Sequence, residues 1–255
     1  MNIIAVIPAR MGSSRFPGKP LADIHGIPMV GHVALRTAMC RAIASTYIAT
    51  CDDVIMEYAA IRGLTAVMTS DAHTRCTDRT AEAMLTIEKT TGKRVDIVVM
   101  VQGDEPMVTP GMIDAALAPM LKDPDLQVVN LMADMADETE FEDPAEVKVV
   151  TDLAGNALYF SREPVPSRKK GCPHVPMRKQ VCIIPFRRDF LLEFNSLPES
   201  PLEIIESVDM MRILENGGRV RMAPISERTL SVDTPDDLRR VKELMKNDPL
   251  RALYG

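Results

Sequence analysis

Short apolar runs alternate with segments of helical spacing through the first half of the chain, and this alternation constrains the fold most strongly. The runs lie at residues 2–7, 46–50, 65–69 and 96–102. Apolar residues recur at helical spacing at residues 28–42, 52–63, 77–90 and 111–121. Near-continuous apolar strands joined by helices are typical of a parallel sheet with helices on both faces. The pattern therefore predicts an α/β fold.

The pattern changes in the second half, which predicts a mixed or antiparallel extension of the parallel sheet. Strand-like segments lie at residues 128–133, 147–152, 157–162 and 181–188, with a polar loop before the last. An amphipathic helix is expected at 201–218, ending at two glycines, and a last helix at 233–245 with Asp233 or Thr234 as its cap. We expect one domain over residues 1–255, in which residues 125–190 form the mixed-sheet subregion.

Composition argues against several classes of partner. The net charge of −6 does not suggest nucleic-acid binding. No apolar run reaches the length of a membrane span, and the first residues do not resemble a signal peptide. The five cysteines are odd in number and form no CxxC pair, which favours a reduced, cytoplasmic protein. Cys172, His174 and Cys182 lack a fourth partner, so we expect no zinc site there.

The stretch PARMGSSRFPGKPL, residues 8–21, is almost a P-loop but fails on spacing. A P-loop has four residues between its glycines and then Lys followed by Ser or Thr. Here five residues separate Gly12 from Gly18, and Lys19 is followed by Pro20, so the hydroxyl that would hold magnesium is missing.

This basic loop still predicts an anion site. It leaves a buried strand, where α/β sheets bind ligands. Arg10, Arg15 and Lys19 can neutralise charge, and Ser13 and Ser14 can donate hydrogen bonds. A solvated basic loop is the less favoured alternative in an acidic protein.

Two aspartates are expected at the same sheet edge. Asp104 follows the most apolar strand, and Asp233 stands at the entrance to the last helix. A turn residue and an N-cap are the simpler interpretations, but two carboxylates beside three cations indicate a magnesium–polyphosphate site. Arg79, in the first turn of a helix where cations are disfavoured, needs either a ligand or a partner carboxylate.

Several motifs occur together in one known family. They are PARMGSSRFPGKPL, MTSDAH, TDRTAEA, VQGDEPM, VKVVTD, ALYFSREPVP, SPLEIIE and VDTPDDLRR. Over residues 3–244 the chain resembles the 3-deoxy-manno-octulosonate (Kdo) cytidylyltransferases. The resemblance implies a Rossmann-like nucleotidyltransferase fold, that of the nucleotide-diphospho-sugar transferases, and a cytoplasmic homodimer. It also implies transfer of CMP from CTP to a 3-deoxy-2-ulosonic acid with Mg²⁺, releasing pyrophosphate, for lipopolysaccharide synthesis.

The resemblance also implies roles for individual residues. The residues that it assigns to nucleotide binding are Pro8, Ala9, Arg10, Ser13, Ser14, Arg15, Lys19, Arg79 and Gln102. It assigns magnesium binding to Asp104 and Asp233. It assigns binding of the sugar acid to Gln102, Arg162, Gln180, Glu206 and Asp209. The catalytic residues are Arg10, Arg15, Lys19, Asp104 and Asp233.

The chain departs from the family pattern mainly on the sugar side. Arg75 and Cys76 replace Ser-Gly, Gln180 and Ile184 replace a His and a Tyr, and Met210 replaces a Gln. Fewer acceptor hydroxyls could be paired, so we expect a related ulosonic acid to be preferred over Kdo.

Two further alternatives stay open at this stage. One is a nucleotidyltransferase for a sugar or alditol phosphate, with Arg168, Lys169 and Lys170 binding the acceptor phosphate. The other is a non-catalytic nucleotide-binding module, which the intact cations and aspartates disfavour.

Overall fold

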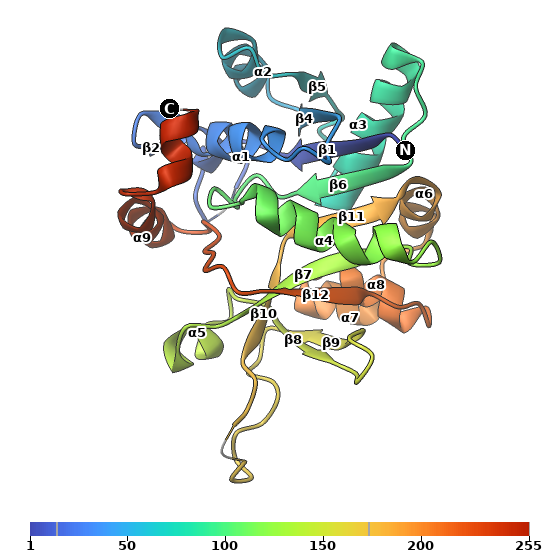
Figure 1. Cartoon of the computed structure of the whole chain (residues 1–255), viewed down its shortest axis with the longest axis vertical. Coiled ribbons are helices and arrows are strands. Elements are labelled where there is room, and N and C mark those ends of the chain that lie inside the picture. The colour runs from blue at the N-terminus through green and yellow to red at the C-terminus, as the bar shows by residue number, and fades with distance from the viewer. Residues whose placement is uncertain (14, 173, 255) are drawn as a thin grey trace. The chain divides into compact units, whose positions relative to one another are not determined.

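The computed structural model describes residues 1–13, 15–172 and 174–254 and separates into two compact units (Figure 1). The first unit comprises Met1–Asp114 and Thr229–Gly255, and the second comprises Ala115–Arg228. The second unit extends beyond the expected subregion at both ends. Ser14, predicted as a phosphate contact, lies outside the described residues.

A parallel sheet forms the centre of the first unit. Its strands are β1 (Ile3–Pro8), β4 (Ser45–Thr50), β5 (Ala66–Met68) and β6 (Ile97–Val101). They lie in the order β6-β1-β4-β5, and each of these neighbouring pairs is parallel. Every residue of β1 and β6 is buried, which explains their continuous apolar runs. The chain passes from β1 to β4 on one side and reaches β6 on the other, so the strand order reverses at β1.

Helices and short elements complete the first unit. They are η1 (Lys19–Leu21), β2 (Asp23–Ile24), β3 (Ile27–Pro28), α1 (Met29–Ala38), α2 (Asp53–Ile61), α3 (Cys76–Thr91), α9 (Pro235–Met245) and η2 (Pro249–Leu253). The helix α4 (Pro110–Lys122) begins in this unit and ends in the second. Val232 and the α9 residues Val241 and Met245 bury their side chains against Ile24 and Met29. This apolar cluster fixes the entrance to α9, where Asp233 lies.

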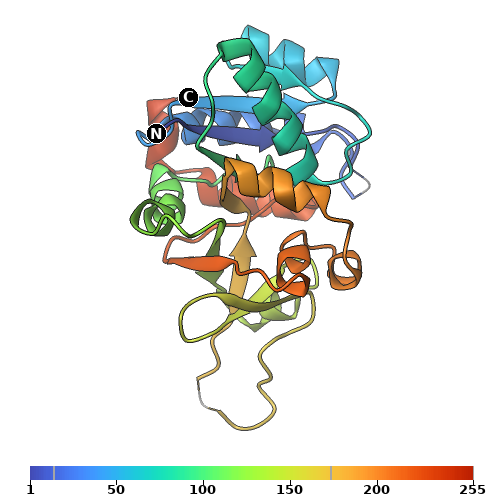
Figure 2. The same ribbon diagram turned by 90° about the vertical axis from the view of Figure 1, so that its right-hand side faces the viewer.

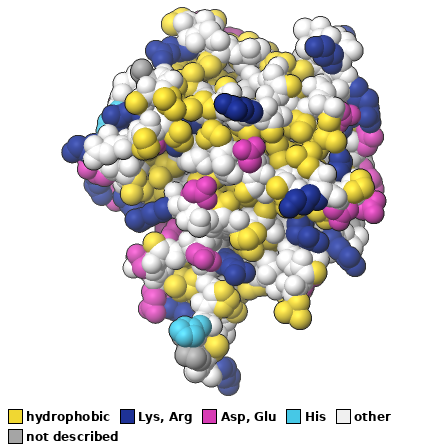
Figure 3. All heavy atoms as spheres, viewed as in Figure 1, with side chains coloured by type: hydrophobic (Ala, Val, Ile, Leu, Met, Phe, Trp, Pro, Cys, Tyr) yellow, Lys and Arg dark blue, Asp and Glu magenta, His cyan; other side chains and the backbone are white. Residues whose placement is uncertain are grey.

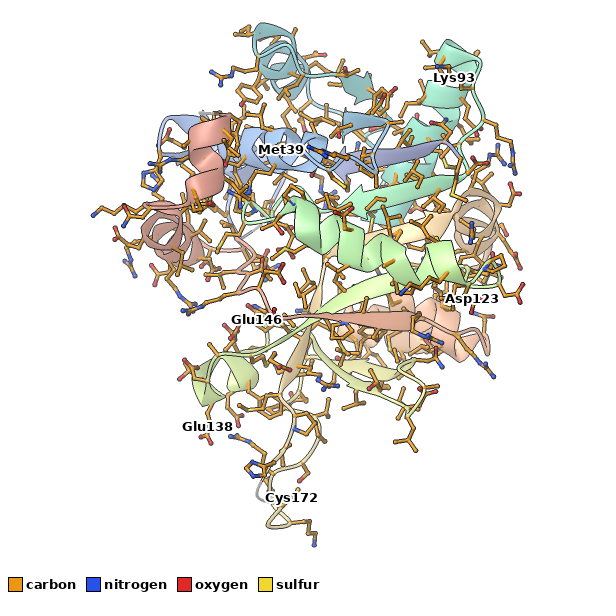
Figure 4. All side chains as sticks on the ribbon, viewed as in Figure 1. Met39, Lys93, Asp123, Glu138, Glu146 and Cys172 are labelled. Carbon is orange, nitrogen blue, oxygen red and sulfur yellow. The ribbon has the colours of Figure 1, made fainter. Side chains whose placement is uncertain are left out.

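The second unit contains a mixed sheet, as predicted. Its strands are β7 (Val129–Asp134), β8 (Lys148–Thr151), β9 (Ala157–Ser161), β10 (Arg178–Val181) and β12 (Arg221–Ile225). In the order β12-β7-β10-β8-β9, the first pair is parallel and the others are antiparallel. The unit also contains β11 (Ile183–Arg187), α5 (Glu138–Glu142) and α6 (Arg188–Ser196). The described part of the β9–β10 connection projects from this sheet in both ribbon views (Figures 1 and 2), and it carries Cys172, which is labelled in Figure 4.

The helix expected at residues 201–218 is wrong in one respect, because it is two short helices. These are α7 (Pro201–Glu206) and α8 (Met210–Glu215). Ser207 between them has a left-handed backbone with φ 53°, which ends α7. The predicted glycine ending is confirmed, since Gly217 has φ 76° and the Gly218 N–H donates to the carbonyl of Ile213.

The visible surface mixes charges of both signs. Figure 3 shows basic and acidic side chains interspersed with apolar ones across one face. Within the described part of the chain, no helix is both long enough and apolar enough to span a membrane.

Candidate nucleotide and metal site

A cavity opens where β1 and β6 end, which is the point at which the strand order reverses. Open α/β sheets bind ligands at such points, beyond the carboxyl ends of the strands. The cavity has a volume of about 250 Å³. Nine of the predicted site residues line it: Pro8, Ala9, Arg10, Ser13, Arg15, Lys19, Gln102, Asp104 and Asp233. Residues that the sequence assigns to one site therefore share one cavity, and their roles stay predictions.

Gly103 allows the two strand ends to come close together. A Cβ atom at this position would lie 2.9 Å from the carbonyl oxygen of Pro8 and 3.3 Å from the Cβ of Ala9. Any larger residue would push the segment after β6 away from the basic loop. Gly103 lines the cavity but was not among the predicted site residues. Its position two residues beyond the end of β6 and one before Asp104 is the signal that could have identified it.

Lys19 lies at the centre of the charged groups. Its Nζ is 2.7 Å from Oδ2 of Asp104 and 3.1 Å from Oδ1 of Asp233, and it donates to the carbonyl of Val232 at 2.9 Å. Burial alone lowers the pKa of Lys19, but the two carboxylates outweigh it, so its pKa lies above the ordinary value. The ammonium is therefore charged at neutral pH. Three oxygens converge on one cationic position.

The backbone holds the two aspartates together. The N–H of Val232 donates to the carbonyl of Asp104 at 2.9 Å, which ties the segment after β6 to the segment before α9. This hydrogen bond involves no side chain, so no pattern in the amino-acid sequence predicts it. Two carboxylates that repel each other are thus fixed near one another by backbone geometry, and a cation between them offsets the repulsion.

The basic loop is closed on itself and anchored to α2. The Gly18 N–H donates to the carbonyl of Met11 at 3.0 Å, and Gly18 has φ 76°. The N–H of Met11 donates to a carboxylate oxygen of Asp52 at 2.8 Å. The guanidinium of Arg15 lies 3.0 Å from Oδ1 of Asp233, with half of its side chain exposed. A closed loop with exposed cations is suited to a ligand that carries several negative charges.

Asp233 does not cap the last helix. Thr234 is the N-cap of α9, and its hydroxyl accepts a hydrogen bond from the N–H of Asp237. The carboxylate of Asp237 in turn accepts from the N–H of Thr234, which completes a capping box. The carboxylate of Asp233 is thus available to Lys19 and Arg15, and the simpler interpretation of this residue is wrong.

Arg79 donates hydrogen bonds to a hydroxyl and a backbone carbonyl, and its charge interacts with the carboxylate of Glu82. It is buried, and its NH1 donates to the hydroxyl of Thr69 at 2.5 Å. Its NH2 donates to the carbonyl of His73 at 3.5 Å. In this structure Arg79 therefore holds the segment between β5 and α3, and its contact with a nucleotide stays a prediction. Cys76, at the start of α3, lines the cavity.

Arg162 and Glu206, two of the residues predicted for the sugar side, lie in the second unit and contact each other. The Glu206 carboxylate accepts from the Tyr159 hydroxyl at 3.0 Å and the Arg162 N–H at 2.8 Å. Arg162 donates through Nε to the carbonyl of Glu206 at 2.7 Å and through NH1 to that of Pro144 at 2.9 Å. Both side chains therefore stabilise the unit internally, and their contact with a sugar acid stays a prediction.

Buried charges fix the loop that Arg162 contacts. The ammonium of Lys148 donates to the carbonyls of Asp143, Glu146 and Arg162. Lys179 pairs with Glu140 and with Glu146, which is labelled in Figure 4. Burial raises the pKa of Glu146, although Lys179 opposes the shift. The loop 143–146 and the end of β9 are thus held as one piece.

Gln180 and Asp209, also predicted for the sugar side, lie in the second unit as well. The amide of Gln180 donates to Oδ1 of Asn130 at 2.6 Å. Asp209 stands at the N-terminal end of α8.

Comparison with known proteins decides the family. A model of cytidylyltransferases matches residues 4–227. The 3-deoxy-manno-octulosonate cytidylyltransferase of Geobacter sulfurreducens is 43% identical, covering 96% of this chain and 100% of the relative. That of Solibacter usitatus is 41% identical, covering 99% and 98%. The chain belongs to the 3-deoxy-manno-octulosonate cytidylyltransferase family.

Solved structures agree with this family and its fold. The structure of CMP:2-keto-3-deoxy-manno-octonic acid synthetase complexed with CTP has 37% identity and a TM-score of 0.88. The match covers 97% of this chain and all of that one. A putative glucose-1-phosphate thymidylyltransferase from Bacillus anthracis, at 16% identity and a TM-score of 0.66, shares the fold. The predicted α/β nucleotidyltransferase fold is confirmed.

The separation of Asp233 from the cap gives a direct test. Asp233→Asn removes a charge that Lys19 contacts, so turnover should fall by at least about 10²-fold without loss of folding. Thr234→Ala removes the cap, so it should cost about 1 kcal/mol of unfolding free energy with turnover retained. Steady-state kinetics and thermal unfolding of both variants measure these effects. Near-normal turnover of Asp233→Asn at saturating magnesium would contradict the assignment.

Proposed function

We propose that the chain transfers CMP from CTP to the anomeric hydroxyl of a 3-deoxy-2-ulosonic acid, with Kdo as the first candidate, and releases pyrophosphate. The observation that carries this proposal is the convergence of Lys19, Asp104 and Asp233 at the switch point of the sheet. Relatives named 3-deoxy-manno-octulosonate cytidylyltransferases over their full length support it.

The cations of the basic loop would stabilise the negative charge that develops on the leaving pyrophosphate during the reaction. Attack of the anomeric oxygen on the α-phosphorus breaks the bond to the bridging oxygen of the leaving pyrophosphate. Such transfers depend on positioning and charge stabilisation rather than on covalent help from the protein. Arg10, Arg15 and Lys19 line the cavity and supply positive charge for the departing phosphates.

The donor set fits a magnesium ion. Magnesium usually takes one or two carboxylates and completes its shell with water and phosphate oxygens. Asp104 and Asp233 provide two carboxylates that already converge on a single cation, the ammonium of Lys19. These two residues would hold Mg²⁺. When bound, it would neutralise phosphate charge and make the attacking hydroxyl more acidic.

The substitutions on the sugar side are accommodated within the fold. Ile184 and Met210 are buried, and Gln180 donates to Asn130. This argues that the protein has repacked around them, so Kdo is retained as the first candidate. The preference for another ulosonic acid stays a prediction that an acceptor assay can test.

A phosphate-bearing acceptor is less well supported. Arg168, expected from the sequence to bind an acceptor phosphate, pairs with Glu138 and Glu142. Its guanidinium also lies 5.0 Å from the centre of the Phe141 ring. A cation committed to two carboxylates and an aromatic ring has less attraction left for a phosphate.

The acceptor assay defines the activity. Pyrophosphate release should require CTP, Mg²⁺ and a 3-deoxy-2-ulosonic acid, with kcat/KM for the best acceptor at or above ~10⁴ M⁻¹s⁻¹. Kdo and related ulosonic acids are compared under identical conditions. An acid that exceeds Kdo by about tenfold would confirm the predicted shift in preference. The proposal would be contradicted if pyrophosphate were released with a sugar or alditol phosphate but with none of the ulosonic acids.

Lys19 gives a second test, because a divalent cation between the aspartates must displace its ammonium. Lys19→Met should lower kcat by about 10²-fold. The same variant should bind Mn²⁺ about tenfold more tightly in the absence of CTP. Calorimetry measures the binding. Lys93→Met, at an exposed lysine on a distant loop (Figure 4), is the control and should change neither quantity. Unchanged metal affinity in Lys19→Met would contradict the competition.

A homodimer in the cytoplasm is the setting that we propose. All five cysteines are free thiols, which suits a reducing compartment. Leu153, Leu158, Ile204 and Ile205 in the second unit are each more than half exposed. Exposed apolar side chains of this size mark interfaces, and a second copy of the chain is the occupant we propose.

Sedimentation tests the dimer. The unmodified protein should have twice the 28.2 kDa mass of the chain. Ile205→Asp should shift it to the monomer, because the interface would bury an unpaired charge. Ile61→Asp changes an equally exposed side chain in the first unit and should leave the mass unchanged. A monomeric unmodified protein would refute this proposal.

A further inference from the structure

The C-terminal segment after α9 makes polar contacts with α1. Asp248 accepts from the N–H of Leu250 through Oδ1 and pairs through Oδ2 with Arg36 of α1. The hydroxyl of Tyr254 accepts from NH1 of Arg36 at 3.2 Å and lies 2.8 Å from Nδ1 of His32. The C-terminal segment lies beside α1 (Figure 1), and Met39, labelled in Figure 4, directly follows that helix.

Arg36 connects this segment to the loop that follows β6. Only 2% of Arg36 is exposed. Its Nε donates to the carbonyl of Val108 at 2.5 Å and its NH2 to that of Met107 at 3.4 Å. One guanidinium therefore bridges the C-terminal segment and the residues just beyond Asp104.

The bridged loop is the one that forms the site. Residues 102–108 leave β6, and they carry Gln102 and Asp104, which line the cavity. Two turns keep this loop compact, with the Glu105 N–H donating to Gln102 and the Val108 N–H donating to Glu105. Lys19 holds the loop at Asp104, and Arg36 holds its other end at Met107 and Val108.

The cost of burying Arg36 suggests that this residue positions the groups that it contacts. An arginine removed from water needs a hydrogen-bond partner for each of its donors. Apolar residues in its place would often stabilise a protein equally well. The segment that supplies Asp248 buries little itself, since none of the residues of η2 is buried. Its contacts with α1 are thus mainly polar and directional.

We propose that Arg36, Asp248 and Tyr254 form a positioning group through which the C-terminal segment holds the 102–108 loop, and with it Asp104, in place for CMP transfer. The proposal rests on the proposed function. None of the three residues contacts the reacting groups; each acts through the loop.

Two conservative variants test the group in the full-length chain. Asp248→Asn keeps an N-cap for η2 but removes the charge that faces Arg36. Tyr254→Phe removes only the hydroxyl that Arg36 and His32 share. Both should lower kcat about tenfold, with a smaller change in KM for CTP. In the absence of ligands, amide hydrogen exchange in residues 102–108 should be about tenfold faster.

Matched controls separate positioning from general stability. Asp137→Asn changes another capping aspartate, on α5. Tyr58→Phe removes a buried hydroxyl that has no hydrogen-bond partner among the described residues. Neither control should alter exchange in residues 102–108.

Two results would overturn the proposal. One is unchanged exchange in residues 102–108 for both Asp248→Asn and Tyr254→Phe. The other is faster exchange with kcat unaffected. If the unmodified protein releases no pyrophosphate with any ulosonic acid, the proposed function fails, and the exchange data then report whether the loop is held.

Discussion

The ion pairs between one lysine and two aspartates are the interaction on which the site depends. The sheet brings Asp104 and Asp233 to the same edge, and their mutual repulsion would otherwise push the loops apart. Lys19 offsets this repulsion from within the basic loop, so the same contact fixes the position of the loop. A metal and a nucleotide would therefore bind to charged side chains that already lie together, and they would exchange the partners of these side chains.

The sequence predicted the first unit well because local patterns determine it. Continuous apolar strands can only be buried on both faces, and the loops that leave them must meet at one edge. This reasoning brought together Arg15, Lys19, Asp104 and Asp233. It could not supply the carbonyl of Val232, since every residue has one.

Contacts that follow no spacing rule escaped prediction. Arg79 had no visible partner in the sequence, and the structure gives it a hydroxyl and a carbonyl. Arg36 pairs with Asp248 across the length of the chain, and no spacing rule connects them. The helix expected at 201–218 failed for another reason: its apolar spacing continues through Ser207, while the backbone there turns left-handed. Periodicity reports which face is buried, not whether the axis is continuous.

The division of the first unit between the two ends of the chain has a consequence for biosynthesis. Residues 115–228 are made after Asp104 and before Asp233, so the whole second unit leaves the ribosome before the first can be completed. Domains generally fold as units during synthesis, starting from the N-terminus. Here the strands β1, β4, β5 and β6 are made early, but the residues of α9 that complete the apolar cluster of the first unit come only with residues 229–255. Asp104 and Asp233 therefore cannot come together in a nascent chain until the whole second unit has been made.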